Sequence, residues 1–268
     1  MRGRHNPGVP LPLLVPAAIG IAFLVLPLIG LLVRAPWTAL APALVRPEIG
    51  QALRLSLLSA TLATAVSIVL GVPIAWVLAR SRIRGRTLLR ALVTVPLVLP
   101  PVVGGVALFL VLGRQGLLGH WLFEQFGFTI PFTTTAVVIA ETFVAMPFLV
   151  ISVEGALRAA DARFEDAAAT LGADRWTTFR RVTLPLVAPG IAAGAVLCWA
   201  RALGEFGATI TFAGNFPGTT QTMPLAVYLA LQHDPEAAIV LSVVLLAVSL
   251  ATLLSLRGRW LGRAGAAP

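Results

Sequence analysis

The sequence has few of the residues that usually cover a soluble protein. Only 12% of its 268 residues are charged, whereas 58% are apolar, and its mean hydropathy is +0.92. Soluble domains carry about twice that share of charge, because polar side chains must cover the core. The composition therefore excludes an ordinary water-soluble enzyme, and it also excludes a disordered chain.

Cysteine and histidine are also scarce. The one cysteine, Cys198, excludes an intrachain disulfide and a cysteine metal cluster. The three histidines, His5, His120 and His233, lie far apart in the sequence and predict no metal site. There is no G-x-x-x-x-G-K-[ST] phosphate loop. No soluble domain lies between the apolar runs, so we expect ATP hydrolysis and ligand capture to reside on other chains.

Lysine is absent, so all 20 basic residues are arginine, and the formal net charge is +9. In a soluble protein such an excess indicates nucleic-acid binding. In a membrane protein it more often reflects arginine that flanks the spans on the cytoplasmic side. Because the composition is so apolar, we expect this chain to contact membrane lipid and no nucleic acid.

Six apolar runs are long enough to cross a bilayer. A helix needs about 20 apolar residues to cross ~30 Å of hydrocarbon. The runs cover about residues 11–33, 55–79, 88–112, 132–153, 184–203 and 237–256. They are continuous and do not alternate, which argues against a β-barrel. The sequence therefore predicts an all-α polytopic membrane protein, with one transmembrane domain of six helices over residues 1–268.

The arginines divide unequally between the two sides of a six-span arrangement. Fifteen lie in the N-terminus, the 80–90 loop, the 154–183 loop and the C-terminal tail, and five lie on the other side. The positive-inside rule then places both termini in the cytoplasm. Arg2 and Arg4 also precede the first run as they would in a secretory signal. That run is longer than a signal core and lacks a small-residue cleavage site, so we expect it to be retained.

Proline interrupts the third run at Pro96, Pro100 and Pro101, which are followed by Gly104 and Gly105. Proline removes a backbone donor and kinks a helix. Inside a membrane, such a break is tolerated where protein or a water-filled cavity satisfies the freed groups. A simple kink and a bent helix that lines a pathway both fit this pattern.

The loop of residues 154–183 has the clearest local pattern. Asp161 can cap a short helix over residues 162–171, and Gly172 can end it. Asp174 can cap a second helix, in which Trp176 and Phe179 share a face. Two short amphipathic helices joined by a glycine turn could enter a groove on a partner protein or rest on lipid headgroups. The pattern alone does not separate these alternatives.

This loop resembles the EAA loop of binding-protein-dependent ABC importer permeases. That family's pattern is Glu-Ala-Ala, a glycine six positions after the glutamate, and a closing Leu-Pro. The matching residues here are Asp166, Ala167, Ala168, Gly172, Leu184 and Pro185. Aspartate stands where glutamate is usual, and Glu165 precedes it. The resemblance implies a coupling loop at residues 154–183 that docks on a separate ATPase subunit, which binds ATP and Mg. The chain itself would be a transport subunit with no catalytic residue and no cofactor.

The stretch after the fifth run resembles the molybdate permeases of that family. Its Arg-x-x-Gly-Glu-Phe-Gly pattern at residues 201–207 is shared with sulfate and thiosulfate permeases, and the continuation at 208–224 is closer to molybdate permeases. The resemblance implies molybdate uptake by alternating access, with sulfate, thiosulfate or tungstate as the alternative substrate. A passive anion channel is a remote alternative. The implied partners are a second copy of the chain, ABC ATPase subunits and an extracytoplasmic oxyanion-binding protein. The implied location is a bacterial-type plasma (inner) membrane.

Arg201 and Glu205 are candidates for the pathway or for a structural pair. They lie four residues apart, so a helix would let each neutralise the other. A fixed internal salt bridge and exposure of Arg201 to the pathway both fit. Glu141, in the fourth run, is a functional candidate by default, and we expect it to be paired or near the outer interface. Hydroxyl groups that could meet an oxyanion or bond the backbone of a bent segment belong to Thr209, Thr211, Thr219, Thr220 and Thr222.

Overall fold

The computed structural model describes residues 11–81 and 83–264, and this part of the chain is helical with no strand. The helices are α1 (Leu11–Arg34), α2 (Trp37–Leu44), α3 (Pro47–Arg80), α4 (Arg86–Val98), α5 (Pro101–Leu112), α6 (Gly119–Phe126), α7 (Thr134–Ala159), α8 (Arg163–Thr170), α9 (Arg175–Thr178), the π-helical turn η1 (Phe179–Thr183), α10 (Leu184–Leu203), α11 (Gly207–Phe212), α12 (Met223–His233) and α13 (Pro235–Ala264). Arg2 and Arg4, which entered the orientation argument, lie outside the described residues.

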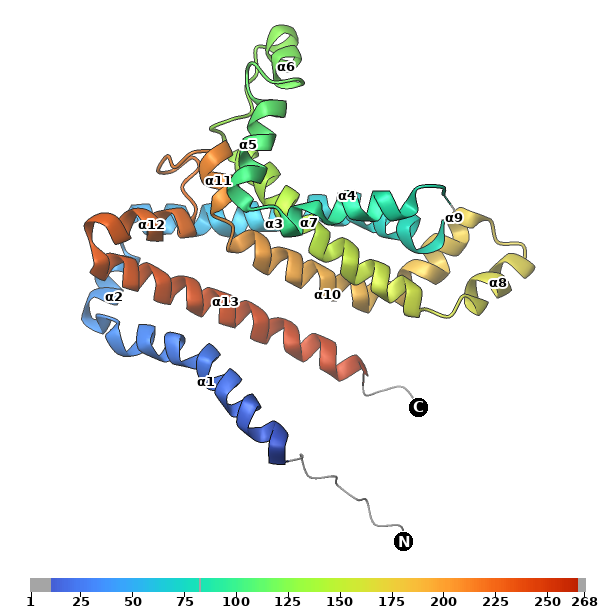
Figure 1. Cartoon of the computed structure of the whole chain (residues 1–268), viewed down its shortest axis with the longest axis horizontal. Coiled ribbons are helices and arrows are strands. Elements are labelled where there is room, and N and C mark those ends of the chain that lie inside the picture. Colours follow the sequence, from blue (N-terminus) through green and yellow to red (C-terminus); the bar gives the residue numbers. More distant parts are fainter. Residues whose placement is uncertain (1–10, 82, 265–268) are drawn as a thin grey trace.

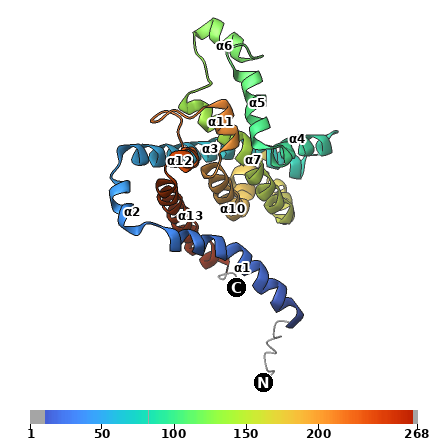
Figure 2. The ribbon, with the colours of Figure 1, turned by 60° about the vertical axis from the view of Figure 1, so that its left-hand side comes forward.

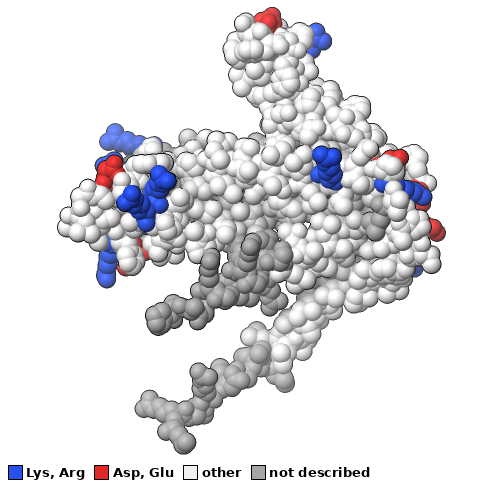
Figure 3. All heavy atoms as spheres, turned by 180° about the vertical axis from the view of Figure 1, so that it is seen from behind, with Lys and Arg blue, Asp and Glu red and all other residues white. Residues whose placement is uncertain are grey.

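Five segments of the described chain are long and apolar enough to cross a membrane, and a sixth is added if α4 and α5 count as one span. The five are Pro12–Arg34, Pro47–Arg80, Thr134–Ala159, Arg175–Leu203 and Pro235–Thr252. Charged side chains gather mostly at the two ends of the helix bundle and on α6, with a broad apolar surface between the ends (Figure 3). The predicted all-α, multi-pass fold is confirmed.

The core lies where α3, α7 and α10 pack against one another (Figure 1). On α3, the fully buried Ala60, Ala63 and Ala75 present almost no side-chain volume, which lets the helices approach closely. Leu149 of α7 belongs to the same buried cluster. On α10, a Cβ added to Gly194 would lie only 2.9 Å from the Cβ of Ser152, so this crossing depends on the glycine. These three helices therefore form the rigid centre of the molecule.

The third predicted span, 88–112, is not one helix. The chain breaks after Val98 and resumes at Pro101, and the two halves meet at an angle of 116°. Pro100 and Pro101 have no backbone N–H to continue the α4 hydrogen bonds, and a residue before proline avoids helical backbone angles. Leu99 is accordingly extended, with ψ of 129°. The break is much sharper than a simple kink.

Because of this break, α5 packs against α11. A Cβ on Gly105 would overlap the hydroxyl of Thr211 and would lie 2.7 Å from the carbonyl oxygen of Ala208. A Cβ on Gly207 of α11 would lie 2.9 Å from the Cβ of Pro101. Both sides of the crossing therefore need a residue without a side chain. Figures 1 and 2 show α5 and α6 rising away from the α3, α7 and α10 core.

The boundaries of the coupling loop also differ from the prediction. Residues 154–159 still belong to α7, which ends only at Ala159. The second predicted helix is not a separate element either, because α9 runs through η1 into α10 as one segment from Arg175 to Leu203. Polarity sets the predicted ends of the spans, whereas the backbone continues as helix beyond those points. The second half of the loop is thus joined to α10 by continuous helix, whereas α8 is separated from α7 by an extended turn at Ala160.

Candidate functional site

The coupling loop protrudes from one end of the core, opposite α2 and α12 (Figure 1). Its first helix, α8, begins after Asp161, whose Oδ1 accepts the backbone N–H of Arg163 at 2.9 Å. Gly172 follows with φ of +84°, a left-handed conformation that favours glycine. The helix predicted over 162–171 is present as Arg163–Thr170, and Gly172 turns the chain as expected.

The second half of the loop begins at Asp174, the predicted cap. Its Oδ1 accepts the backbone N–H of Thr177 at 2.7 Å. Hydrogen bonding by the side chain and then the backbone of Thr177 lowers the pKa of Asp174 below its usual value. Trp176 and Phe179 share a face, as predicted, with stacked rings whose centroids are 5.8 Å apart. The cap and the stack together fix how the chain turns back towards α10.

The outer surface of the loop carries large apolar side chains among its charged ones. Phe164 is 57% exposed, Leu171 88% and Trp176 67%, and Asp166 and Ala167 are exposed beside them. No residue of α8 is buried. Exposed apolar groups gathered on a projecting element are typical of a surface that another molecule covers. The arrangement suits a cleft on a partner protein better than an isolated position in water.

The two ends of the EAA-like pattern meet in the structure. Glu165, next to Asp166, accepts a hydrogen bond from the Thr183 hydroxyl at 3.1 Å, and Thr183 directly precedes Leu184-Pro185. Ala168 is half-buried, whereas Pro185 is exposed at the start of α10. The pattern therefore folds into one compact unit, although 18 residues separate Glu165 from Thr183.

Sequence reasoning missed two ion-pair groups that surround the loop. Arg80, at the end of α3, lies 3.2 Å from Glu165. Glu154 of α7 pairs with Arg90 of α4 and, at 2.8 Å, with Arg158. The spacing of Glu154 and Arg158, four apart on a helix, could have indicated the second pair. The pairs to Arg80 and Arg90 join segments 64 residues or more apart, and no local pattern indicates them.

Arg201 and Glu205 form an ion pair at 2.6 Å, with Glu205 almost fully buried and Arg201 about a quarter exposed. The other oxygen of Glu205 accepts the backbone N–H of Ala208 at 2.8 Å, at the first turn of α11. The carboxylate thus neutralises the arginine and also satisfies a helix terminus. This geometry is that of a structural pair, placed where the chain turns between α10 and α11.

The family model of the binding-protein-dependent transport system inner membrane component matches residues 67–264. This range includes the coupling loop and the Arg201–Glu205 pair. The chain belongs to this family. Its members named below are permeases, that is, transport subunits of the inner membrane.

Curated relatives cover nearly the whole chain. The molybdenum transport system permease protein ModB of Mycobacterium bovis is 50% identical over 244 residues, covering 91% of this chain and 92% of that protein. ModB of Escherichia coli is 42% identical over 213 residues, covering 80% of this chain and 93% of that protein. The sulfate transport system permease protein CysT of E. coli is 38% identical over 237 residues, covering 87% and 85% of the two chains.

Solved structures share the fold. A chain of a bacterial alginate ABC transporter, in complex with a pentasaccharide-bound periplasmic protein, superposes with a TM-score of 0.69 at 19% identity. The superposed region covers 91% of the present chain and 91% of the transporter chain. A chain of the MetNI methionine ABC transporter gives a TM-score of 0.61 at 17% identity, covering 81% and 99%. At these identities the likeness concerns the fold alone.

Glu141 of this permease is buried in the first half of α7, with 1% of its surface exposed. Its Oε1 accepts a hydrogen bond from Ser59 of α3 at 2.8 Å. Nearby, the Ser56 hydroxyl accepts the backbone N–H of Met223 at 2.7 Å, which ties α3 to α12. Among the described side chains, no cation lies within ion-pair distance of Glu141. Its hydrogen-bond partner among the described residues is therefore a hydroxyl group within the core.

The threonines after Arg201 do not form one polar surface. Thr211 donates to the carbonyl oxygen of Gly207 at 2.9 Å, and the Thr220 hydroxyl accepts the N–H of Phe216 at 3.0 Å. These two bond the backbone of the bent segment. Thr209 and Thr222 are buried, and their hydroxyls have no hydrogen-bond partner among the described residues.

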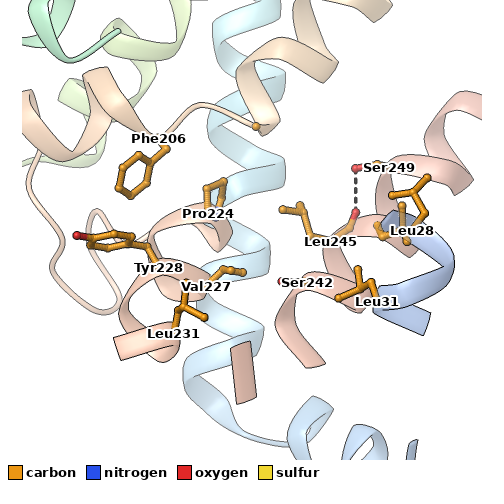
Figure 4. Close-up of a pocket in the computed structure, with 12 residues that line it drawn as sticks. Leu28, Leu31, Phe206, Pro224, Val227, Tyr228, Leu231, Ser242, Leu245 and Ser249 are labelled. Carbon is orange, nitrogen blue, oxygen red and sulfur yellow. Dashed lines mark hydrogen bonds between the residues drawn. The ribbon is translucent and has the colours of Figure 1, made fainter. Parts of the chain in front are cut away.

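A cavity of about 530 Å³ lies between α1, α12 and α13 (Figure 4). Phe206, Val227 and Leu231 line one side of it, and its polar side chains are Ser242 and Ser249 on α13 and Tyr228 on α12. Both serines donate to carbonyls of their own helix, at 2.7 and 2.8 Å. These two serine hydroxyls are therefore not free to donate to an oxyanion. The cavity suits apolar material such as lipid.

Proposed function

We propose that this chain is the membrane-spanning subunit of an ATP-driven ABC importer that takes up molybdate. The observation that carries the proposal is the coupling loop: an EAA-like helical unit with exposed apolar side chains, which follows the end of α7 and runs by continuous helix into α10. The 50% identity to the molybdenum permease of M. bovis, over 91% of the chain, supports molybdate as the substrate. The likeness to CysT keeps sulfate as the alternative, and thiosulfate and tungstate remain alternatives on chemical grounds.

In this proposal the subunit works beside three partners. Two copies of the chain line one pathway, cytoplasmic ATPase subunits receive the two coupling loops, and an extracytoplasmic binding protein delivers the oxyanion. ATP and Mg belong to the ATPase. Both termini and the coupling loop face the cytoplasm, as the arginine distribution predicts. The exposed Phe164, Leu171 and Trp176 supply the apolar contact, and Asp166 supplies an exposed charge beside them.

The mechanism is alternating access. ATP binding closes the partner ATPase, the docked loops move inward, and the spans open outward to receive the ion; hydrolysis then resets them. The pathway needs only weak contacts to the ion, because tight binding would prevent release. The pairing of Arg201 with Glu205 fits this requirement, since a neutralised arginine holds no anion strongly. The binding protein selects the oxyanion.

Uptake into vesicles tests this function. Vesicles that contain the chain, its ATPase and its binding protein should accumulate molybdate only when ATP is supplied on the ATPase side. Flux that is unchanged without ATP would indicate the passive channel. If sulfate competes and molybdate is not taken up, the substrate belongs to the sulfate group instead.

A further inference from the structure

Arg80 brings together three segments at the coupling-loop end of the molecule. It lies in the last turn of α3, and its Nη2 is 3.2 Å from Oε1 of Glu165 in α8. The same nitrogen donates to the carbonyl oxygen of Ala160, directly after α7, at 3.3 Å. The side chains of Arg80 and Glu165 are only 19% and 22% exposed. A pair this sheltered is screened by solvent less than a surface ion pair.

Glu165 extends the connection to α10. Its Oε1 also accepts the hydroxyl of Thr183, which is 1% exposed in η1, at the entrance to α10. One carboxylate thus contacts the end of α3 and the start of α10. Since no residue of α8 is buried, these contacts are a large part of what holds α8 to the spans. In the described structure, α8 otherwise packs mainly against its own loop, at α9 and η1.

An aromatic contact reinforces the same junction. Trp76 lies one helical turn before Arg80, on the same face of α3. Its ring meets that of Phe179 edge-on, with centroids 6.4 Å apart, and Phe179 in turn stacks on Trp176. The end of α3 therefore contacts both halves of the coupling loop, one through charge and the other through aromatic packing.

The neighbouring carboxylate is placed differently. Asp166 is exposed on α8, and no described side chain bonds to its carboxylate. Two consecutive acids thus face opposite surroundings: Glu165 faces the permease's own spans, and Asp166 faces outward. Their structural roles are distinct, although the sequence places them side by side.

We propose that the Arg80–Glu165 pair is a positioning clasp that carries movement of the coupling loop into α3 and α10. The inference rests on the proposed function and names the side chains that transmit the motion. When α8 moves with the ATPase, the clasp moves the end of α3 with it. Without the clasp, α8 can move with the ATPase while α3 and α10 do not move, so ATP is hydrolysed without transport.

The ratio of ATP hydrolysed to molybdate transported tests the clasp in the vesicle system described above. Arg80→Gln and Glu165→Gln remove the charges with little change in size. Each should raise this ratio at least about fivefold, the lower end of typical coupling between sites, while ATP turnover itself stays within about twofold. The double variant should be no worse than either single one, because all three break the same link. The matched control is Arg84→Gln, an exposed arginine between α3 and α4 and outside the coupling loop, which should keep the wild-type ratio.

Two results would overturn the clasp. One is a wild-type ratio in Glu165→Gln, and the other is a double variant whose defect equals the product of the two single defects. The wild-type protein separates the clasp from the proposed function. If wild-type vesicles show no ATP-dependent uptake, the proposed function fails; if they are coupled and Glu165→Gln is equally coupled, only the clasp fails.

Discussion

At the residue scale, side chains that look equivalent in the sequence differ in their surroundings. Glu141, Glu154 and Glu205 are three buried glutamates in the apolar segments. The first is held by a serine, the second by two arginines and the third by one arginine and a helix terminus. The four-residue spacing of Arg201 and Glu205 predicts their pair, although Glu205 lies just after the end of α10 and not on the helix itself. The Ser59–Glu141 contact spans 82 residues, and no spacing rule indicates it.

Gly172 provides a prediction at this scale. Its φ of +84° costs a residue with a Cβ about 1–2 kcal/mol, although no atom would crowd that Cβ. We expect Gly172→Val to distort the turn after α8 and to lower ATP-driven uptake by about fivefold or more. The melting temperature of the spans in detergent should stay unchanged.

Gly172→Asn is the matched control, because asparagine tolerates the left-handed conformation better than valine does. It should retain most of the uptake. Equal loss in both variants would show that the turn's conformation is not what matters, and full uptake in both would count against a coupling role for the turn.

At the element scale, the predicted positions of the helices agree better with the structure than the predicted angles and boundaries. The continuous apolar runs locate α1, α3, α7, α10 and α13, since length and hydropathy suffice to mark a span. Consecutive prolines predict an interruption between α4 and α5. The angle of 116° depends on how α5 packs against α11, which lies about a hundred residues away in the sequence and leaves no local signal. The continuation of α9 into α10 also has no local signal in the sequence, so the sequence pattern does not predict it.

The crossing of α5 and α11 gives a second prediction. Gly105→Leu would place a side chain where Thr211 and Ala208 already lie, and such overpacking costs about 1–3 kcal/mol. We expect a lower melting temperature of the purified protein in detergent, together with reduced uptake. Val106→Leu, at the half-exposed neighbouring position, is the control and should melt like the wild type. Equal melting temperatures for all three proteins would mean that α5 does not pack against α11 as described.

At the scale of the whole molecule, the account depends on which side of the membrane the coupling loop faces. The loop and α6 lie on distinct parts of the structure, with α6 at the tip of the arm that rises from the core (Figures 1 and 2). The unequal distribution of arginine predicts that the loop is cytoplasmic and that α6 faces outward. Composition could predict this orientation, because it is set by charge near the ends of the spans and not by packing.

Labelling of single cysteines from each side of the membrane tests this orientation most directly. The chain's own Cys198 is buried, so an added cysteine is the main reactive site. A membrane-impermeant maleimide should label Leu171→Cys, in the coupling loop, only in inverted membrane vesicles, and should label Phe126→Cys, on α6, in intact cells. Both positions are well exposed, at 88% and 70%. Labelling of Leu171→Cys in intact cells would place the loop outside, where no cytoplasmic ATPase could reach it, and would contradict the account.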